Sequence, residues 1–304
     1  MFIADAHCDT LYQLTIANRA LADCTVAPER MQRGGLCLQT YAMFVGAKGP
    51  AGTPYLDGKK MLAKSGELGV EILRGPLPDA FPNRPTGVLS VEGGELFVGD
   101  LNKLAEFDDD SRLRAVALTW NWENEIGYPG SSGSEKGLKP FGRELIAEMD
   151  RRGILTDVSH LNDAGFWDVV KLSALPPIAT HSNLRWLCDV SRNLTREMAQ
   201  AIIDRGGFIG MNFYASFLVK EGNAAIDDVV RHIDALMEMG GEDVVGFGSD
   251  FDGISAWPEG LGNPADFPNL IDVLRRHGYT EAQIEKIAWK NYWRVLKQAE
   301  KQRA

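Results

Sequence analysis

Short apolar runs alternate with longer amphipathic stretches along this chain. Each run is rich in apolar and β-branched residues and ends at a polar residue, which is typical of a buried parallel strand. The stretches between them space apolar residues three and four positions apart, as in Phe141, Leu145, Ile146 and Met149, and so predict helices. The eight predicted strands are Phe2–Ala6, Leu36–Val45, Gly87–Val91, Arg114–Thr119, Ile154–Val158, Pro177–Thr180, Phe208–Asn212 and Val244–Gly248.

Eight strands that alternate with helices favour a closed parallel sheet over a β-sandwich. An open doubly wound sheet shows the same alternation, but its phosphate-binding motifs GxGxxG and GxxxxGK[ST] do not occur here. We therefore predict a (β/α)8 TIM barrel of the metal-dependent hydrolase type, whose active site lies where the strands end. Residues 1–304 are expected to form one catalytic domain with a C-terminal helix, which opens on a capping box of Thr280 and Gln283.

Composition and charge narrow the class of function. The chain has 304 residues, of which 44% are hydrophobic and 24% charged, and its formal net charge is −10. Because an acidic surface repels a phosphate backbone, we expect no nucleic-acid partner. We find neither a secretion signal nor an apolar stretch of the ~18 residues that cross a bilayer, and expect a cytoplasmic protein without membrane contact. The 4 cysteines form no CxxC pair, which argues against a thiolate zinc site.

Side chains suited to chemistry follow several of the predicted strands. His7 and Asp9 end the first strand, and residues two apart in an extended chain share a face. Glu92 ends the third strand, before two glycines that let the backbone turn closely. His160 and His181 end the fifth and sixth strands, which are neighbours in a barrel. Since imidazoles and carboxylates are the ligands of divalent cations such as zinc, these strand ends predict a metal site.

The remaining acidic and imidazole groups are interpreted in the same way. Asp250 ends the eighth strand, where it would face the metals and take a proton from a bridging water. Asp252 is expected to be a turn residue before Gly253. His232 and His277 are expected to lie on a helix surface and at a helix end, without a role. Taken singly, each group is more often structural than functional, but together they would converge at one end of the barrel.

The sequence resembles the renal (membrane) dipeptidase family of zinc peptidases over nearly its whole length, and is similar to its bacterial-type members. The resemblance rests on the motifs Asp5-Ala-His7-Cys-Asp9-Thr, Ser90-Val-Glu92-Gly-Gly, Asp157-Val-Ser-His160-Leu, Ala179-Thr-His181-Ser-Asn183, Ser191-Arg192-Asn193 and Gly248-Ser-Asp250-Phe-Asp-Gly253. It implies two zinc ions per subunit. His7 and Asp9 would bind one ion, His160 and His181 the other, and Glu92 would bridge them.

The resemblance also assigns residues to substrate binding. Arg192 matches the family's Arg that binds the terminal carboxylate of the substrate, and Tyr214 matches a Tyr that assists this Arg. Where renal-type members carry a His near the scissile bond, this chain has Trp120, whose indole donates a hydrogen bond but cannot take up a proton. Oxyanion stabilisation would then fall to the zinc ions, Asn121 or Asn124.

These observations predict a zinc-dependent dipeptidase, in which a metal-bridging hydroxide attacks the peptide bond and Asp250 passes a proton to the leaving amine. Dipeptides with a C-terminal D-residue are within the expected range, and a homodimer is left open. Two alternatives remain. One is another metal-dependent amidohydrolase barrel, such as a deaminase or lactonase, although those commonly carry HxH rather than HxD on the first strand. The other is a non-catalytic barrel that binds a metal and a small peptide.

Overall fold

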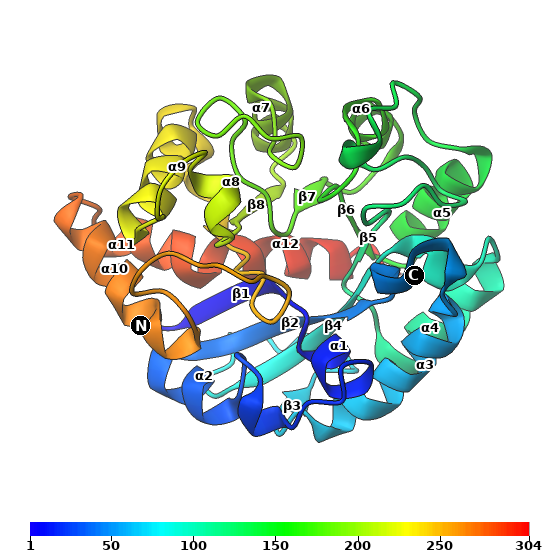
Figure 1. The fold of residues 1–304 in the computed structure, drawn as a ribbon, viewed down its shortest axis with the longest axis horizontal. Coiled ribbons are helices and arrows are strands. Elements are labelled where there is room, and N and C mark those ends of the chain that lie inside the picture. The colour runs from blue at the N-terminus through cyan, green and yellow to red at the C-terminus, as the bar shows by residue number, and fades with distance from the viewer. Residues whose placement is uncertain (304) are drawn as a thin grey trace.

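The strands of the computed structural model, which describes residues 1–303 apart from the side chains of residues 47 and 50, form one closed parallel sheet (Figure 1). The sheet closes because β2 pairs with β1 on one side and with β4 on the other. Its members are β1 (Ile3–Cys8), β2 (Leu36–Phe44), β4 (Thr86–Glu92), β5 (Ala115–Ala117), β6 (Leu155–Asp157), β7 (Ile178–Ala179), β8 (Phe208–Met211) and β9 (Val245–Phe247). The predicted (β/α)8 barrel is confirmed. A short additional strand, β3 (Glu71–Ile72), pairs with the start of β4 and was not predicted.

Helices connect the strands and surround the barrel on the outside (Figure 1). They are α1 (Thr10–Thr15), α2 (Pro28–Gly34), α3 (Pro54–Lys64), α4 (Leu101–Ser111), α5 (Pro140–Arg151), α6 (Asp163–Leu172), α7 (Arg196–Asp204), α8 (Ala215–Leu218), α9 (Ile226–Glu238), α10 (Phe267–Arg276), α11 (Glu281–Glu285) and α12 (Asn291–Glu300). Within the described chain, no helix combines the length and the apolar character that a membrane span requires.

Local sequence signals explain where these helices begin, end and pack. In α5, Pro140 occupies the first turn, where its missing N–H is not needed. Leu145, Ile146 and Met149 form the buried face, as their spacing predicts. The chain leaves the helix through Gly153 at φ 61°, a left-handed conformation that glycine adopts without a steric penalty. The other helices around the barrel likewise turn an apolar face towards the sheet.

The C-terminal helix closes the barrel at the end where the strands begin. Its predicted capping box of Thr280 and Gln283 is present, but the single predicted helix is in fact α11, a π-helical turn at 286–290 and then α12. Tyr292 and Leu296 of α12 belong to one buried cluster with the first inward-facing residues of the strands, including Leu155 and Phe208. The open mouth of the barrel is therefore at the carboxyl ends of the strands.

Near that mouth, three neighbouring strands approach one another so closely that only glycine fits. A Cβ on Gly248, just after β9, would lie 1.7 Å from the carbonyl oxygen of Thr180, and one on Gly210 of β8 would lie 2.1 Å from the same oxygen. These glycines bring the chain segments that carry His181 and Asp250 into direct backbone contact. The close approach at β7, β8 and β9 thus sets the positions of two of the predicted site residues.

We expect Gly248→Ala to lower the free energy of unfolding by about 3 kcal/mol or more, since the added methyl group meets backbone that cannot move aside. The midpoint of urea denaturation measures this. Gly66→Ala is the matched control, because a Cβ there has no neighbour within 4 Å; it should change stability by about 1 kcal/mol or less. Equal midpoints for the Gly248 variant and the unmodified protein would contradict the interpretation.

Candidate active site

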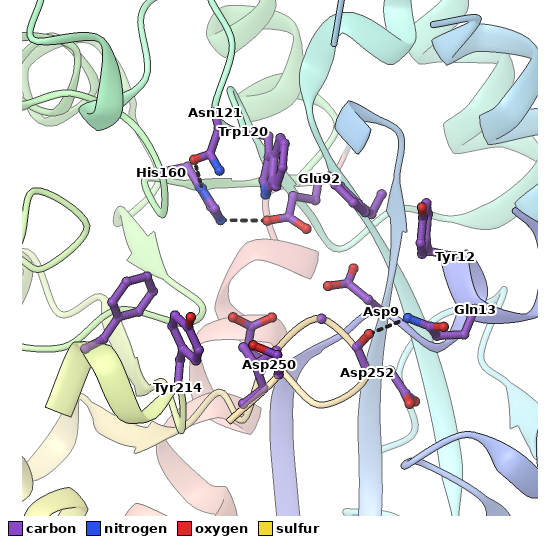
Figure 2. Close-up of a pocket in the computed structure, with 15 residues that line it drawn as sticks. Asp9, Tyr12, Gln13, Glu92, Trp120, Asn121, His160, Tyr214, Asp250 and Asp252 are labelled. Atoms are coloured by element: carbon purple, nitrogen blue, oxygen red, sulfur yellow. Dashed lines mark hydrogen bonds and ion pairs between the residues drawn. The ribbon is translucent and has the colours of Figure 1, made fainter. Parts of the chain in front are cut away.

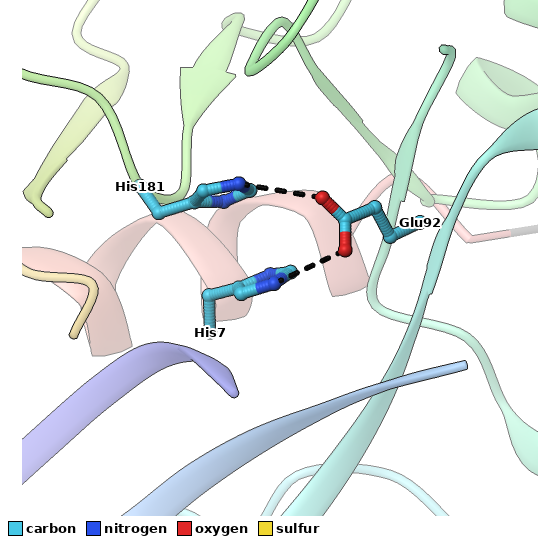
Figure 3. A group of neighbouring side chains, drawn as sticks. All are labelled: His7, Glu92 and His181. Atoms are coloured by element: carbon cyan, nitrogen blue, oxygen red, sulfur yellow. Dashed lines mark ion pairs between the residues drawn. The ribbon is translucent and has the colours of Figure 1, made fainter. Parts of the chain in front are cut away.

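Glu92 lies at the centre of a cluster of three histidines at the barrel mouth. Figure 3 shows its carboxylate facing two of them, His7 and His181. Its Oε2 is 3.4 Å from Nε2 of His7, and its Oε1 is 2.8 Å from Nε2 of His160 and 3.4 Å from Nε2 of His181. The two oxygens of one carboxylate thus face two different groups of imidazoles. All four residues are buried. The structure brings together these residues, which come from the ends of four strands that are far apart in the sequence.

Two further carboxylates complete the cluster on the side of His7. Asp9 Oδ2 is 3.8 Å and Asp250 Oδ1 is 3.9 Å from His7 Nε2. The three residues place one potential ligand atom each within 4.8 Å of one another, as do His7, Glu92 and His181. Gly253 keeps the space between the carboxylates open, since a Cβ there would lie 2.0 Å from Asp9 Oδ2 and 2.5 Å from Asp250 Oδ1.

Burial shifts the ionisation of this cluster in opposite directions for different members. Burial and then the charge of Glu92 raise the pKa of Asp9 to about 7, and burial raises that of Asp250 to about 6. Burial would also raise the pKa of Glu92, but the charge of the adjacent His7 and then the nearby rings of His160 and His181 hold it well below its usual value. The cluster therefore concentrates negative charge on Glu92.

The donor set fits divalent cations. Among the described residues, the buried atoms His7 Nε2 and Asp9 Oδ1 have no hydrogen-bond partner, although unpaired buried polar atoms are costly. The Nε2 atoms of His160 and His181 lie 3.0 Å apart and both face Glu92. Imidazole nitrogens and carboxylate oxygens directed at shared points are the arrangement of a metal site. His7, Asp9 and Glu92 can hold one cation, and Glu92, His160 and His181 a second.

The cluster forms the floor of a cavity of about 370 Å³ at the barrel mouth (Figure 2). Its walls are aromatic. On one side the ring centre of Phe44 lies 5.3 Å from the ring centre of Tyr12 and 4.9 Å from that of Trp120. Tyr214 and Phe217 line the other side, and their rings meet edge to face at 4.9 Å. The cavity therefore combines an acidic floor with apolar walls, as small-molecule sites commonly do.

The predicted substrate-binding residues occupy different positions around this cavity. Trp120, Asn121 and Tyr214 line it. The side chain of Arg192 lies beside it: its guanidinium is 5.4 Å from the ring centre of Phe217, and Nη2 is 3.4 Å from the carbonyl oxygen of His181. Its buried Nε has no acceptor among the described residues, which leaves a donor for another molecule.

Asn212 is a site residue that the sequence interpretation missed. Its Nδ2 donates to Oδ2 of Asp250 at 2.9 Å, and its Oδ1 accepts from the backbone N–H of Tyr214 at 2.6 Å. Asn212 therefore orients the side chain of Asp250 and fixes the backbone at Tyr214. A signal was present, because this Asn is the polar residue that ends the run Phe208–Asn212.

Asp252 has more contacts than the predicted turn requires. It has a left-handed backbone with φ 67°, as a turn residue would. Its carboxylate also accepts hydrogen bonds from Thr10 Oγ1 at 2.7 Å and from the backbone N–H groups of Thr25 and Val26 at 2.6 and 3.1 Å. Asp252 thus ties the loop after β9 to the segment that follows β1.

Two expectations about individual residues are wrong. His232 is not on a helix surface, because it is fully buried in α9. Its Nδ1 accepts a hydrogen bond from the backbone N–H of Leu184 at 3.2 Å, and its Nε2 lies 3.3 Å from the carbonyl oxygen of Leu218. Asn124 does not face the cavity, because its side chain bonds to Glu95 and to backbone groups of its own loop. His277 does lie at the C-terminal end of its helix, with ion pairs to acidic residues of α9.

A barrel with this cluster at its mouth defines a metal-dependent hydrolase. The sequence model of the membrane dipeptidase family, peptidase family M19, matches residues 1–304. The chain belongs to this family. Structures in the family include a metallopeptidase described as a dipeptidase, which matches this chain with a TM-score of 0.87. The chain is accordingly a metallo-dipeptidase.

The chain is also similar to several individual proteins. An uncharacterized protein encoded in the pqqA 5′ region of Klebsiella pneumoniae is 40% identical over 220 residues, 69% of this chain and 80% of that protein. An uncharacterized dipeptidase of Schizosaccharomyces pombe is 34% identical over 195 residues, 62% of this chain and 47% of that protein. A metallopeptidase from Rhodobacter sphaeroides, solved with a phosphinate mimic of the dipeptide L-Ala-D-Ala, has a TM-score of 0.87 at 28% identity and covers 98% of this chain and 99% of its own.

We expect a divalent cation to stabilise this fold, because it would pair the buried carboxylates. After dialysis against a chelator, adding excess Zn²⁺ should raise the melting temperature on the order of 5 °C. Glu92→Gln should lose most of this rise. Glu95→Gln is the matched control, since Glu95 bonds to Asn124 rather than facing the histidines. The assignment of Glu92 fails if both variants respond to zinc like the unmodified protein.

Proposed function

We propose that this chain is a binuclear zinc dipeptidase that hydrolyses the peptide bond of dipeptides, including those with a C-terminal D-residue. One observation carries the proposal: the two oxygens of Glu92 face different ligand atoms, Oε2 at 3.4 Å from His7 Nε2 and Oε1 at 2.8 Å from His160 Nε2. A bridging carboxylate of this kind is what a two-metal site needs. The phosphinate mimic bound by the similar Rhodobacter sphaeroides enzyme supports a dipeptide as the substrate.

Zinc suits the proposed ligands, which are His7 and Asp9 for one ion, His160 and His181 for the other, and Glu92 for both. Imidazole favours zinc over magnesium or calcium, which prefer ligand sets made of oxygen alone. When bound, zinc ions supply Lewis acidity that polarises a carbonyl and lowers the pKa of water from ~15.7 towards ~7. The chain's own residues must then bind and orient the substrate and move the proton.

Asp250 is suited to moving that proton. Its Oδ1 faces the metal ligands, 3.9 Å from His7 Nε2, while Oδ2 accepts from Asn212 at 2.9 Å. Burial raises its pKa to about 6, close to neutral, where a carboxyl group can accept a proton and return it. We assign to Asp250 the transfer of a proton from water to the leaving amine, with Asn212 fixing its orientation.

Arg192 is suited to binding the C-terminal carboxylate. Its side chain lies beside Phe217, which lines the cavity, and its Nε is free to donate. Guanidinium binds carboxylate through paired, charge-assisted hydrogen bonds. A cation fixed near the floor of a small cavity would require a free carboxylate close to the scissile bond, which limits the substrate to short peptides. Tyr214, on the same side of the cavity, would support the bound substrate.

The wall of Tyr12, Phe44 and Trp120 is suited to an apolar side chain of the substrate. Trp120 packs on Phe44, and its ring centre lies 6.1 Å from that of His160. It is therefore close to the proposed zinc centre. An indole takes up no proton, and acid–base work therefore falls to Asp250. That residues 1–304 act as one catalytic domain and that the protein is cytoplasmic stay predictions, and a homodimer stays an open alternative.

The proposal is tested by metal analysis together with a substrate panel on the same preparation. We expect two zinc ions per chain and hydrolysis of L,L- and L,D-dipeptides, but not of lactones or amino-nucleobases. Asp250→Asn should retain zinc and lower kcat by ~10²–10⁴-fold, the usual contribution of a general acid–base group. Asp243→Asn, an exposed change of the same kind, should match the unmodified protein. Peptides that bind but remain intact would favour the non-catalytic alternative.

Arg192→Ala should raise KM for dipeptides by ~10–100-fold, which corresponds to the loss of charge-assisted hydrogen bonds. Dipeptide amides, which lack the terminal carboxylate, isolate the interaction. The unmodified enzyme should discriminate strongly between a dipeptide and its amide, whereas the variant should treat the two alike. If the variant keeps the full preference for the free carboxylate, Arg192 is not its binding residue.

A further inference from the structure

Two of the proposed zinc ligands are held by hydrogen bonds on the side of the ring that points away from the cluster. His181 Nδ1 lies 2.8 Å from Oγ1 of Thr180, and His160 Nδ1 lies 3.3 Å from Oδ1 of Asn121. The opposite nitrogens, both Nε2, face Glu92. Figure 2 shows the bonds of His160 to Asn121 and to Glu92 on opposite sides of its ring.

The hydrogen bonds of Thr180 leave one arrangement of protons. Its hydroxyl is bonded to Oδ2 of Asp157 as well as to His181. A carboxylate only accepts, so the single hydroxyl proton goes to Asp157. The hydroxyl oxygen must then accept from His181, which requires a proton on Nδ1. With Nδ1 protonated in a neutral ring, Nε2 carries the lone pair that a metal needs.

Asp157 is fixed by bonds that do not involve the histidine. Its Oδ1 accepts from the backbone N–H of Ser159 at 2.9 Å and of Thr180 at 3.0 Å. Asp157 ends β6 and Thr180 follows β7, so these bonds join two adjacent strands. Asp157, Thr180 and His181 are all buried. A carboxylate held by the sheet itself thus determines the direction of the hydroxyl.

The corresponding bond of His160 is weaker. The amide oxygen of Asn121 is neutral, the distance is longer, and Asn121 is exposed in the loop after β5. An amide oxygen only accepts, so this bond also favours a proton on Nδ1 and a lone pair on Nε2.

We propose that Asp157 and Thr180 form a positioning pair that fixes His181 in the tautomer with a free Nε2, and that Asn121 performs the same task less strongly for His160. This inference rests on the proposed zinc centre. It assigns a role to Asp157 and Thr180, which only orient a ligand, and it makes Asn121 a positioning residue in addition to part of the cavity wall. Partners of this kind typically contribute ~10–100-fold to metal affinity.

Thr180→Val removes the hydroxyl and keeps the shape of the side chain. We expect it to lower zinc affinity at one of the two sites by ~10–100-fold in competition with a chromophoric chelator. Thr180→Ser restores a hydroxyl and should bind zinc within about threefold of the unmodified protein. Thr156→Val is the matched control, because Thr156 is also buried but its hydroxyl makes no hydrogen bond among the described residues. Asn121→Leu should cause a loss smaller than that of Thr180→Val.

Nitrogen-15 NMR of the histidine rings in metal-free protein reads the tautomer directly. His181 should carry its proton on Nδ1 in the unmodified protein and in Thr180→Ser, and should lose this preference in Thr180→Val. A proton on Nε2 in the unmodified protein overturns the proposal, and this measurement decides the matter even if Thr180→Val fails to fold. Unchanged zinc affinity in a folded Thr180→Val also overturns it. By contrast, an unmodified protein that binds no zinc would refute the proposed function while the NMR result still stands.

Discussion

Everything at the barrel mouth depends on one electrostatic constraint, the burial of several carboxylates around a single glutamate. Asp9, Glu92 and Asp250 are removed from water, and an unpaired buried charge destabilises a fold by several kcal/mol. Three histidines supply part of the compensation, and the cations of the proposed metal centre would supply the rest. The barrel makes this possible because its parallel strands all end at the same rim, so residues from distant parts of the chain meet within hydrogen-bond distance. At the opposite end of the barrel, where the strands begin, α12 packs into an apolar core. The burial of this core offsets the free-energy cost of the buried polar groups at the mouth.

The backbone is also strained at the barrel mouth. His160, Asp250 and Asp252 have φ values of 68°, 63° and 67°, three of the six positive values at non-glycine residues in the described chain. Each such residue costs on the order of 1–3 kcal/mol and persists only where the surroundings hold it. Asn212 donates a hydrogen bond to Asp250. Asp252 accepts hydrogen bonds from the hydroxyl of Thr10 and from the backbone N–H groups of Thr25 and Val26.

The sequence alone predicted the eight strands and the convergence of six imidazole and carboxylate side chains. This was possible because polar residues at the ends of parallel strands all lie at the same end of a barrel. It did not predict partners that depend on register between strands. Thr180 meets Asp157 only because β6 and β7 are aligned as they are, and nothing in either segment encodes that alignment. His232 was misplaced for a different reason: it lies three residues after Val229 on the buried face of α9, a signal that was present but was outweighed by its polarity.

The position of Trp120 shows how the acidic floor and the apolar wall divide the work. An indole that packs on Phe44 and lies close to His160 cannot exchange a proton, so this side of the cavity contributes shape and exclusion of water rather than acid–base chemistry. The next residue, Asn121, turns back to hold His160. Under the two proposals, one short loop after β5 would serve both the wall that contacts the substrate and the positioning of a metal ligand. A change in that loop that alters the substrate range would also act on the metal centre, since the two functions share adjacent residues.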